Sequence, residues 1–557
     1  MRSVHSVLTA LVLAFCLLTV PAASDDKAAD DKTTAGDPLI YAEETFEVSP
    51  LPGHGRDSGP LQKRVVDERP AREHGFLPSA EMRRLKDNAM WSWSDDRRPA
   101  TALEGQALTK NGPRPLVPTA TSSFDGLNRL DSGHRGFLFL PPDTIVAAGP
   151  NHILEGTNVA ARLTNRAGGN PVVRSLYSLF GHNLPAVMFD PKFYYDRLSG
   201  RFFMVALFQN ENPNQSFVYL AVSRSSTPRT LNVPADWCSY RIQGRVGESW
   251  ADYPGLGMNE NYIAISTNNF NFTGGFRSAY LTALDKAPLV NNANRCPNMT
   301  VRRFKLAQDA FGSVAFTVQP AQHYSTNNSE GTPLYLVSSQ PVATSSRYTF
   351  WRLFDRAGES APVISRQQIE TNENYSIPPE ALQNGGSPMD SGDLRIQQAV
   401  FRNGTVWAVH GTTCNFGSLP AEACVRVLGI EPNNGGETVT YDETIGGGDG
   451  WYYWMPGVAV NANDDVMITY QRSHATLSVG VGFASKLNGA ADFTGNKLIN
   501  GRCGIDNFDG NTNRTGDYVG IQTDPVDNNS FWIAGEYSAT VGRRACDWRT
   551  RIARVLP

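Results

Sequence analysis

A recurrent pattern of short β-strands constrains this chain more than any other feature. From about Phe124 onward, short runs of β-branched and aromatic residues alternate with turns rich in Asn, Asp, Gly and Pro. This alternation is typical of strands joined by hairpins. Because no long helical period of apolar residues interrupts it, the sequence predicts an all-β fold.

The strands group into seven larger units, each with a polar strand start, a turn, a second apolar strand and a variable tail. The units begin near Asp143, Asp190, Asp252, Gln322, Arg395, Tyr453 and Asp517, at intervals of about 62 residues. Seven four-stranded sheets closed into a ring would bury the faces and protect the edges that a single sheet exposes. We therefore expect a seven-bladed β-propeller over residues 121–557, with a β-sandwich pair as the alternative.

The N-terminal region has a different composition. Arg2 begins a short basic start, the apolar run from Val7 to Val20 is too short to span a bilayer, and small residues follow it. We predict a signal peptide over residues 1–23, and hence a secreted or periplasmic protein without a transmembrane segment. Residues 24–120 are charged and poor in alternating apolar runs, which predicts an irregular leader or pro-segment with one short helix from Ser79 to Trp91.

Six cysteines remain once the predicted signal peptide is removed. An even number in an oxidising compartment favours disulfides, although six cysteines allow fifteen pairings. No Cys-x-x-Cys pair occurs, which disfavours a thiolate zinc site. We expect one local pair and two longer-range pairs: Cys414–Cys424, Cys238–Cys296 and Cys503–Cys546.

Charge and motif content exclude several classes of function. The 50 Lys and Arg residues nearly balance 54 Asp and Glu residues, so we expect neither nucleic-acid binding nor attraction to an anionic membrane. The sequence contains no Gly-x-Ser-x-Gly and no His-Glu-x-x-His motif, and we expect no catalytic metal or cofactor. Structural calcium stays open at two oxygen-rich segments, Asn461–Asp465 and Asp524–Asn529, where turns are the favoured interpretation.

Several phrases carry a resemblance to a known group of proteins. They are PPDTIVAAGPNHI, FDPKFYYDRLSGRFFM, AVSRSSTPRTL, ADYPGLGMNENYIAIS and GDYVGIQTDPVDNNSFWIAGEY. Over about Phe124 to Pro557 the chain resembles poorly characterised exported bacterial β-propeller proteins, whose broader architecture is similar to sialidases. The repeated Ser-x-Asp-x-Gly-x-x-Trp turns of sialidases are absent, and no arginine triad can be matched. The resemblance therefore implies a fold and no particular reaction.

The resemblance also implies where a ligand would bind, because the innermost strands of a propeller converge on one axis and their starts face one mouth. Carboxylates, aromatic faces, a histidine and an arginine at such a mouth are typical of a carbohydrate site. The candidate catalytic residues are Asp143, Asp252, Tyr253, His323 and Asp517. The candidate substrate-binding residues are Arg395, Gln397, Tyr453, Trp454 and Tyr518.

Each candidate has a structural alternative. An Asp before a strand, as at Asp190, commonly caps a turn, and a lone histidine is more often an ordinary hydrogen-bonded one. The aromatic run from Trp451 to Trp454 either offers a stacking platform or packs between blades. Three hypotheses follow: a glycoside hydrolase or polysaccharide lyase, a non-enzymatic binder of an extracellular glycan or protein, and a structural envelope protein.

Overall fold

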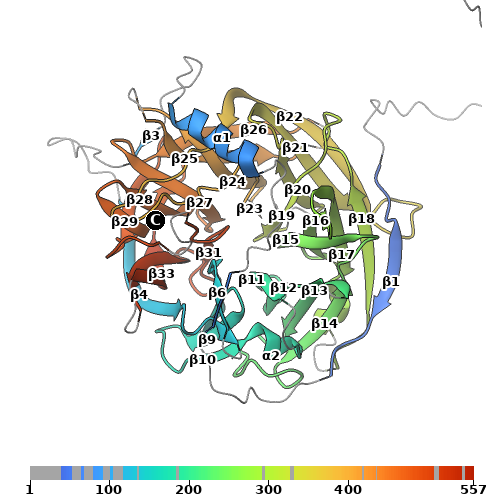
Figure 1. The fold of residues 1–557 in the computed structure, drawn as a ribbon. Coiled ribbons are helices and arrows are strands. Elements are labelled where there is room, and N and C mark those ends of the chain that lie inside the picture. The colour runs from blue at the N-terminus through green and yellow to red at the C-terminus, as the bar shows by residue number, and fades with distance from the viewer. Residues whose placement is uncertain are drawn as a thin grey trace, which may run out of the picture. The chain divides into compact units, whose positions relative to one another are not determined.

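Antiparallel β-strands make up most of the structure, and the described part of the chain contains only three short helices (Figure 1). The all-β prediction is confirmed. The computed structural model describes residues 39–52, 64–67, 79–91, 101–103, 117–134, 137–182, 187–211, 213–291, 295–326, 332–416, 420–433, 436–506, 513–541 and 546–557. The predicted signal peptide lies outside the described residues.

Within these residues the strands form seven sets of four antiparallel neighbours. The first three sets are β7 (Ile145–Ala148) to β10 (Val172–Ser175), β11 (Val187–Asp196) to β14 (Trp237–Gln243), and β15 (Ser249–Met258) to β18 (Met299–Leu306). The next three are β19 (Gln319–His323) to β22 (Val363–Ser376), β23 (Gln398–Arg402) to β26 (Thr438–Gly446), and β27 (Trp451–Val460) to β30 (Thr494–Ile499). The last joins β31 (Gly520–Thr523), β32 (Phe531–Thr540) and β33 (Cys546–Leu556) to an early strand, β4 (Thr119–Asn128).

The intermediate strands complete these sets in chain order. They are β8 (His152–Thr157), β9 (Ala160–Asn165), β12 (Arg201–Glu211), β13 (Asn214–Ser223), β16 (Tyr262–Asn271), β17 (Phe276–Asp285), β20 (Leu334–Ser339), β21 (Thr344–Phe354), β24 (Thr405–Cys414), β25 (Glu422–Glu431), β28 (Val466–His474) and β29 (Leu477–Lys486). In β16 all positions but the last are buried, because neighbouring sets cover both faces of the sheet. Burial in such a strand does not alternate along the chain, and β16 carries Ser, Thr and Asn at buried positions beside its apolar residues.

The first strands of the seven sets contact one another in a cyclic order. Each of β7, β11, β15, β19, β23 and β27 contacts the next first strand, and β31 contacts β7 again. Parallel pairing between β15, β19 and β23 fuses three of the sets into one fourteen-stranded sheet. Every one of the seven units expected from the sequence contains one first strand.

Parts of the leader are more ordered than the sequence suggested. Strand β1 (Glu44–Val48) pairs with β18, and β3 (Thr101–Ala102) pairs with β26. Strand β2 (Arg64–Asp67) pairs with β6 (Phe137–Leu140), which also pairs with β5 (Gly133–His134). Helix α1 (Ser79–Trp91) has the bounds expected from the sequence. The other helices are α2 (Leu176–Phe180) and α3 (Ala287–Asn291).

Helix α1 is held onto the β-sheets by apolar and charged contacts. Met82 and Leu85 pack against a buried cluster built from β19 to β25, and Lys86 forms an ion pair with Asp390. The leader therefore contributes a helix to the face near the beginnings of the first strands.

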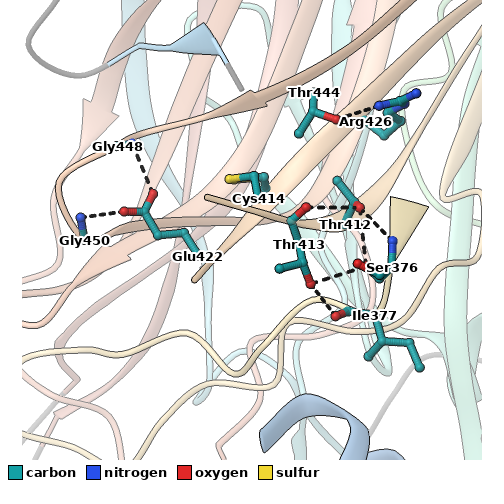
Figure 2. Close-up of a disulfide and its surroundings, with 11 residues drawn as sticks. Ser376, Ile377, Thr412, Thr413, Cys414, Glu422, Arg426, Thr444, Gly448 and Gly450 are labelled. Carbon is teal, nitrogen blue, oxygen red and sulfur yellow. Dashed lines mark hydrogen bonds between the residues drawn. A yellow bond between two sulfur atoms is a disulfide. The ribbon is translucent and has the colours of Figure 1, made fainter. Parts of the chain in front are cut away.

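All three predicted disulfides are present. Cys238–Cys296 links β14 to the segment before β18, with the Cα atoms 5.3 Å apart. Cys414–Cys424 links β24 to β25 (Figure 2), and Cys503–Cys546 joins the segment after β30 to β33. Such bonds are typical of proteins from oxidising compartments. Among the helices that the structure describes, none has the length and apolar character to cross a membrane.

Candidate functional site

A residue with a left-handed backbone lies before each first strand or within its first half. Their φ angles are 48° at Asp143, 51° at Asp190, 47° at Tyr253, 48° at Thr317, 77° at Gly392, 48° at Met455 and 116° at Gly516. In β11, β15 and β27 the position coincides with a β-bulge. The sequence signal is a proline directly after the left-handed residue in these three strands, because proline within a sheet is confined to edges and bulges. Sequence reasoning overlooked this signal.

Hydrogen bonds at these positions connect one set of strands to the next. The Asp517 backbone N–H donates to Asp143 Oδ1 at 2.7 Å, and Asn158 Nδ2 donates to Asp143 Oδ2 at 2.7 Å. The Asp190 N–H donates to Asn158 Oδ1 at 2.8 Å, and the Tyr253 N–H donates to Asp190 Oδ2 at 3.1 Å. Asp143 and Asp190 thus accept from the backbone of neighbouring sets, a structural role different from the local turn cap considered at Asp190.

The same aspartates form the centre of a buried charged cluster. Asp143, Asp190 and Asp517 each place a carboxylate oxygen within 4.8 Å of the others. Lys192 Nζ lies 3.2 Å from the centroid of the Tyr518 ring, and Arg514 forms an ion pair with Asp517. We call these six residues the strand-start cluster: Asp143, Asp190, Lys192, Arg514, Asp517 and Tyr518.

Burial shifts the protonation of the strand-start cluster. It raises the pKa of Asp143 to about 6, with a further contribution from the Asp517 charge. It raises the pKa of Asp190 well above its usual range, helped by the charge of Asp252, and lowers the pKa of Lys192 to about 7. The three carboxyls could form a cation site, but Lys192 and Arg514 already supply positive charge there.

Sequence reasoning did not identify Lys192 or Arg514. Lys192 is the single lysine of β11, a mainly aromatic and apolar strand that also carries Asp190 and Asp196, and it is only 7% exposed. A lysine at a buried position of such a strand is a usable signal, because lysine is almost never fully buried without a partner. Arg514 lies before β31, and no comparable pattern marks it in the sequence.

Three of the remaining candidates lie beside the cluster. Asp252 is buried, and its charge acts on Asp190. Gln397 Nε2 donates to the Asp517 carbonyl at 3.4 Å. The Arg395 guanidinium donates to both oxygens of Asp393, at 2.7 and 2.6 Å, and lies 4.3 Å from the centroid of the Tyr253 ring. Because Asp393 already occupies Arg395, this arginine offers only part of its donor capacity to a ligand.

Tyr253 and Tyr518 do not occupy equivalent positions, although both follow an Asp in the sequence. Tyr253 is itself the left-handed residue of β15, whereas Tyr518 follows the left-handed Gly516, before β31, by two residues. The two tyrosines therefore occupy different positions in their strand sets. The two rings nevertheless meet edge to face, with centroids 6.2 Å apart.

His323 lies away from the cluster, so the expected proton shuttle at a strand start is wrong. It is the last residue of β19, whereas Gln319 is the first. Its ring is fully buried, stacks on Tyr335 with centroids 5.4 Å apart and contacts Phe401 at 4.7 Å. Burial lowers its pKa to about 3, so this imidazole is neutral at physiological pH.

Tyr453 and Trp454 do not form a stacking platform. Both side chains are fully buried; the Tyr453 ring stacks on Tyr470 at 4.2 Å, and Trp454 Nε1 donates to Thr515 Oγ1 at 3.3 Å. Only Trp451 of this run is partly exposed, and the Arg472 guanidinium lies 3.9 Å from its ring centroid. No ring face of Tyr453 or Trp454 is accessible to a sugar.

The glycine-rich loop before this run is anchored. Glu422, next to the Cys414–Cys424 disulfide, accepts hydrogen bonds from the N–H groups of Gly448 at 3.2 Å and Gly450 at 2.7 Å (Figure 2). Burial raises the pKa of Glu422 to about 7.

The two oxygen-rich segments considered for calcium form hairpin turns. Asn461 Oδ1 accepts the N–H groups of Asn463 and Asp465, each at 2.9 Å. Asp524 accepts the Val526 N–H at 2.9 Å and forms ion pairs with Arg166 and Arg554. Local bonds of this kind account for the Asn and Asp residues at both turns.

A small pocket, with a volume of about 20 Å³, lies beside the strand-start cluster. Arg395 and Asp393 line it, together with Phe316 and Met82 of α1. Arg395 lies between the pocket and the cluster: its guanidinium is 5.1 Å from the Phe316 ring and 4.3 Å from the Tyr253 ring, which in turn meets Tyr518 of the cluster. An ordered pair of charged groups at the edge of a pocket can orient a small polar ligand.

Comparison with known proteins adds little to this geometry. No family model matches the chain, and no curated protein matches it. One solved structure, described as an unknown function protein from Dyadobacter fermentans DSM 18053, aligns with 56% of this chain and 96% of its own, at 11% identity and a TM-score of 0.26.

Proposed function

We propose that this chain is an exported seven-bladed β-propeller that binds a glycan over the beginnings of its first strands. Seven sets of four strands, the cyclic contacts of their first strands and the completion of the last set by β4 support the propeller. Three disulfides support an oxidising compartment.

The pocket at Arg395 carries the glycan proposal. It places the Phe316 ring beside the ordered Arg395–Asp393 pair. Fixed charged groups accept and donate hydrogen bonds to sugar hydroxyls, whereas the Phe316 ring, only 3% exposed, forms an apolar wall behind the pair. Asp517 is the most accessible carboxylate of the neighbouring cluster, with 26% of its side chain exposed, whereas Asp143 and Asp190 are buried.

Hydrolysis by a retaining mechanism is the second candidate. The carboxylate oxygens of Asp143 and Asp517 lie within 4.8 Å, close to the separation of about 5–5.5 Å between the two carboxyls of retaining glycosidases. Asp143, with its raised pKa, would be the acid and Asp517 the nucleophile. Burial of Asp143 and its two hydrogen bonds oppose direct contact with substrate, so we place binding ahead of catalysis.

The test is binding of the purified mature chain to a panel of polysaccharides, read by affinity electrophoresis and by calorimetry. Val342 lines the pocket and is 40% exposed, so Val342→Trp should fill the pocket without unfolding the chain and should weaken glycan binding at least about tenfold. The matched control is Val173→Trp, at a 46% exposed valine of β10. Loss of binding in both variants, or in neither, would contradict the proposal.

Product analysis of the same incubations distinguishes an enzyme that cleaves the glycan from a protein that only binds it. New reducing ends that disappear in Asp517→Asn would identify a hydrolase, and unsaturated ends would identify a lyase. Binding with no product from any bound glycan would leave the non-enzymatic version as the function.

A further inference from the structure

A second polar cluster lies at the opposite ends of the first strands. Tyr194 and Arg197 lie at the end of β11, Tyr324 directly follows β19, Arg402 ends β23 and Thr523 ends β31. Asn528, in the turn between β31 and β32, contacts both arginines. These residues come from four of the seven strand sets, and they meet because β15, β19 and β23 run parallel and neighbouring first strands contact one another.

The two arginines share a neutral acceptor. Arg402 Nη2 donates to Asn528 Oδ1 at 2.8 Å, and Arg197 Nη1 donates to the same oxygen. Arg402 Nη1 donates to the Val460 carbonyl at 3.1 Å, while its buried Nε has no hydrogen-bond partner among the described residues. Two guanidinium groups thus face one amide oxygen, where a carboxylate or another anion is the usual partner.

Neighbouring carboxylates form no ion pair with either arginine among the described residues. Asp196 forms a buried ion pair with Lys286 at 2.5 Å. Asp464 accepts from the neutral Asn403 amide at 2.7 Å, and its charge offsets only part of the cost of burying Arg402. Asp524 is paired with Arg166 and Arg554, and Asp527 with Arg554. The positive charge of Arg197 and Arg402 is therefore not matched by an ion pair among the described residues.

The unmatched positive charge of Arg197 and Arg402 is energetically unfavourable because Arg402 is buried. Arg402 is only 5% exposed, and burial together with the charge of Arg197 lowers the pKa of its guanidinium to about 10. The Tyr194 and Tyr324 rings meet edge to face at 6.2 Å, and the Arg402 guanidinium lies 5.9 Å from the Tyr324 centroid. Arg197 and Asn528 are partly exposed, which leaves the cluster accessible from solvent.

We propose that Arg197 and Arg402 form a binding site for one oxyanion, such as phosphate, sulfate or a carboxylate group, at the ends of the first strands. The anion would approach on the partly exposed side of Arg197 and accept from both guanidinium groups. This site lies at the strand ends opposite the pocket at Arg395 and does not depend on glycan binding there.

The test is isothermal titration calorimetry of the full mature chain, in chloride buffer at constant ionic strength, with inorganic phosphate, sulfate and acetate in separate titrations. We expect at least one of the three to bind with a stoichiometry of one. Preference for phosphate or sulfate would identify a tetrahedral anion as the ligand class, and preference for acetate would identify a carboxylate. Absence of binding by all three would overturn the proposal.

Variants of Asn528 and Arg197 keep the test decisive if a change at buried Arg402 prevents folding. Asn528→Asp supplies an internal carboxylate to both arginines, so it should abolish anion binding and raise the melting temperature of the anion-free protein. Its matched control is Asn170→Asp, in another exposed turn with a similar left-handed backbone (φ 52°, against 57° at Asn528). Arg197→Gln should weaken binding about tenfold or more, whereas Arg347→Gln, at an exposed arginine of β21, should not. Wild-type affinity in both Asn528→Asp and Arg197→Gln would refute the site.

Discussion

Replacement of Gly516 by alanine tests whether the strand-start cluster depends on its left-handed positions. Gly516 has a φ of 116°, and a Cβ atom there would lie 2.4 Å from Asp143 Oδ1 and 2.6 Å from the Asp143 backbone nitrogen. Real Cβ atoms essentially never approach another atom so closely. The alanine must therefore displace Asp143, which accepts the Asp517 N–H at 2.7 Å.

Three contributions set the expected loss of stability. The backbone conformation costs an L-residue about 1–2 kcal/mol. Displacement of a buried neighbour costs about 1–3 kcal/mol, and loss of the hydrogen bond to buried Asp143 about 1–3 kcal/mol more. We expect Gly516→Ala to lower the free energy of unfolding by about 3–6 kcal/mol, since the three contributions overlap in part.

The control is Gly489→Ala, in the turn between β29 and β30. Gly489 also has a positive φ, of 78°, but no atom lies within 4 Å of an added Cβ. The free energy of unfolding of Gly489→Ala should therefore fall only by the backbone contribution of about 1–2 kcal/mol. Urea titrations of both variants under non-reducing conditions, compared at equal m-values, measure the difference. If Gly516→Ala loses no more than Gly489→Ala, the reasoning about Asp143 is wrong.

Two further predictions concern the disulfides and a buried carboxyl. Serine replacement of the Cys238–Cys296 pair, which closes a loop of 58 residues, should lower the free energy of unfolding by about 4 kcal/mol. The same replacement of the Cys414–Cys424 pair, with its loop of 10, should lower it by about 3 kcal/mol. A denaturant titration that ranks the two losses in the reverse order would contradict the loop-entropy argument. Burial raises the pKa of Glu536 from 4.5 to about 8, so the native state keeps a proton that the unfolded chain releases between these values, and stability should fall as pH rises through that window. Glu536→Gln should flatten this part of the melting-temperature profile, and an unchanged profile would count against the assignment.

The class and organisation of the fold could be predicted because their signals are local. Hairpin turns and short apolar runs mark each strand, and their recurrence gives the seven units. The even number of cysteines indicated disulfides, and spacing marked only the local Cys414–Cys424 pair; the other two pairs were one of the three arrangements open to the remaining four cysteines. The pairing of β1, β2 and β3 could not be predicted, because these strands are short segments of a charged leader and their partners lie far along the chain.

The site was predicted in part, and the errors have a physical origin. Asp143 and Asp517 were identified because they lie shortly before the first strands β7 and β31. His323 was misplaced because β19 begins at Gln319, so that residues assumed to start the strand in fact end it. Trp454 was misassigned because its ring packs inward next to Thr515, a choice of face that neighbouring sheets determine.

The non-glycine left-handed residues connect the fold to the proposed site. A residue such as Asp190 or Tyr253 in this conformation costs about 1–3 kcal/mol, and it persists only where the surroundings fix it. Here the surroundings are the neighbouring sets, through Asn158 to Asp190 and through Asp190 to the Tyr253 N–H. Glycine would relieve the strain at either position but would remove the Asp190 carboxylate from the cluster or the Tyr253 ring that meets Tyr518 beside it. The bonds that hold the strained backbone therefore also fix two of the side chains on which a site at the strand starts would depend.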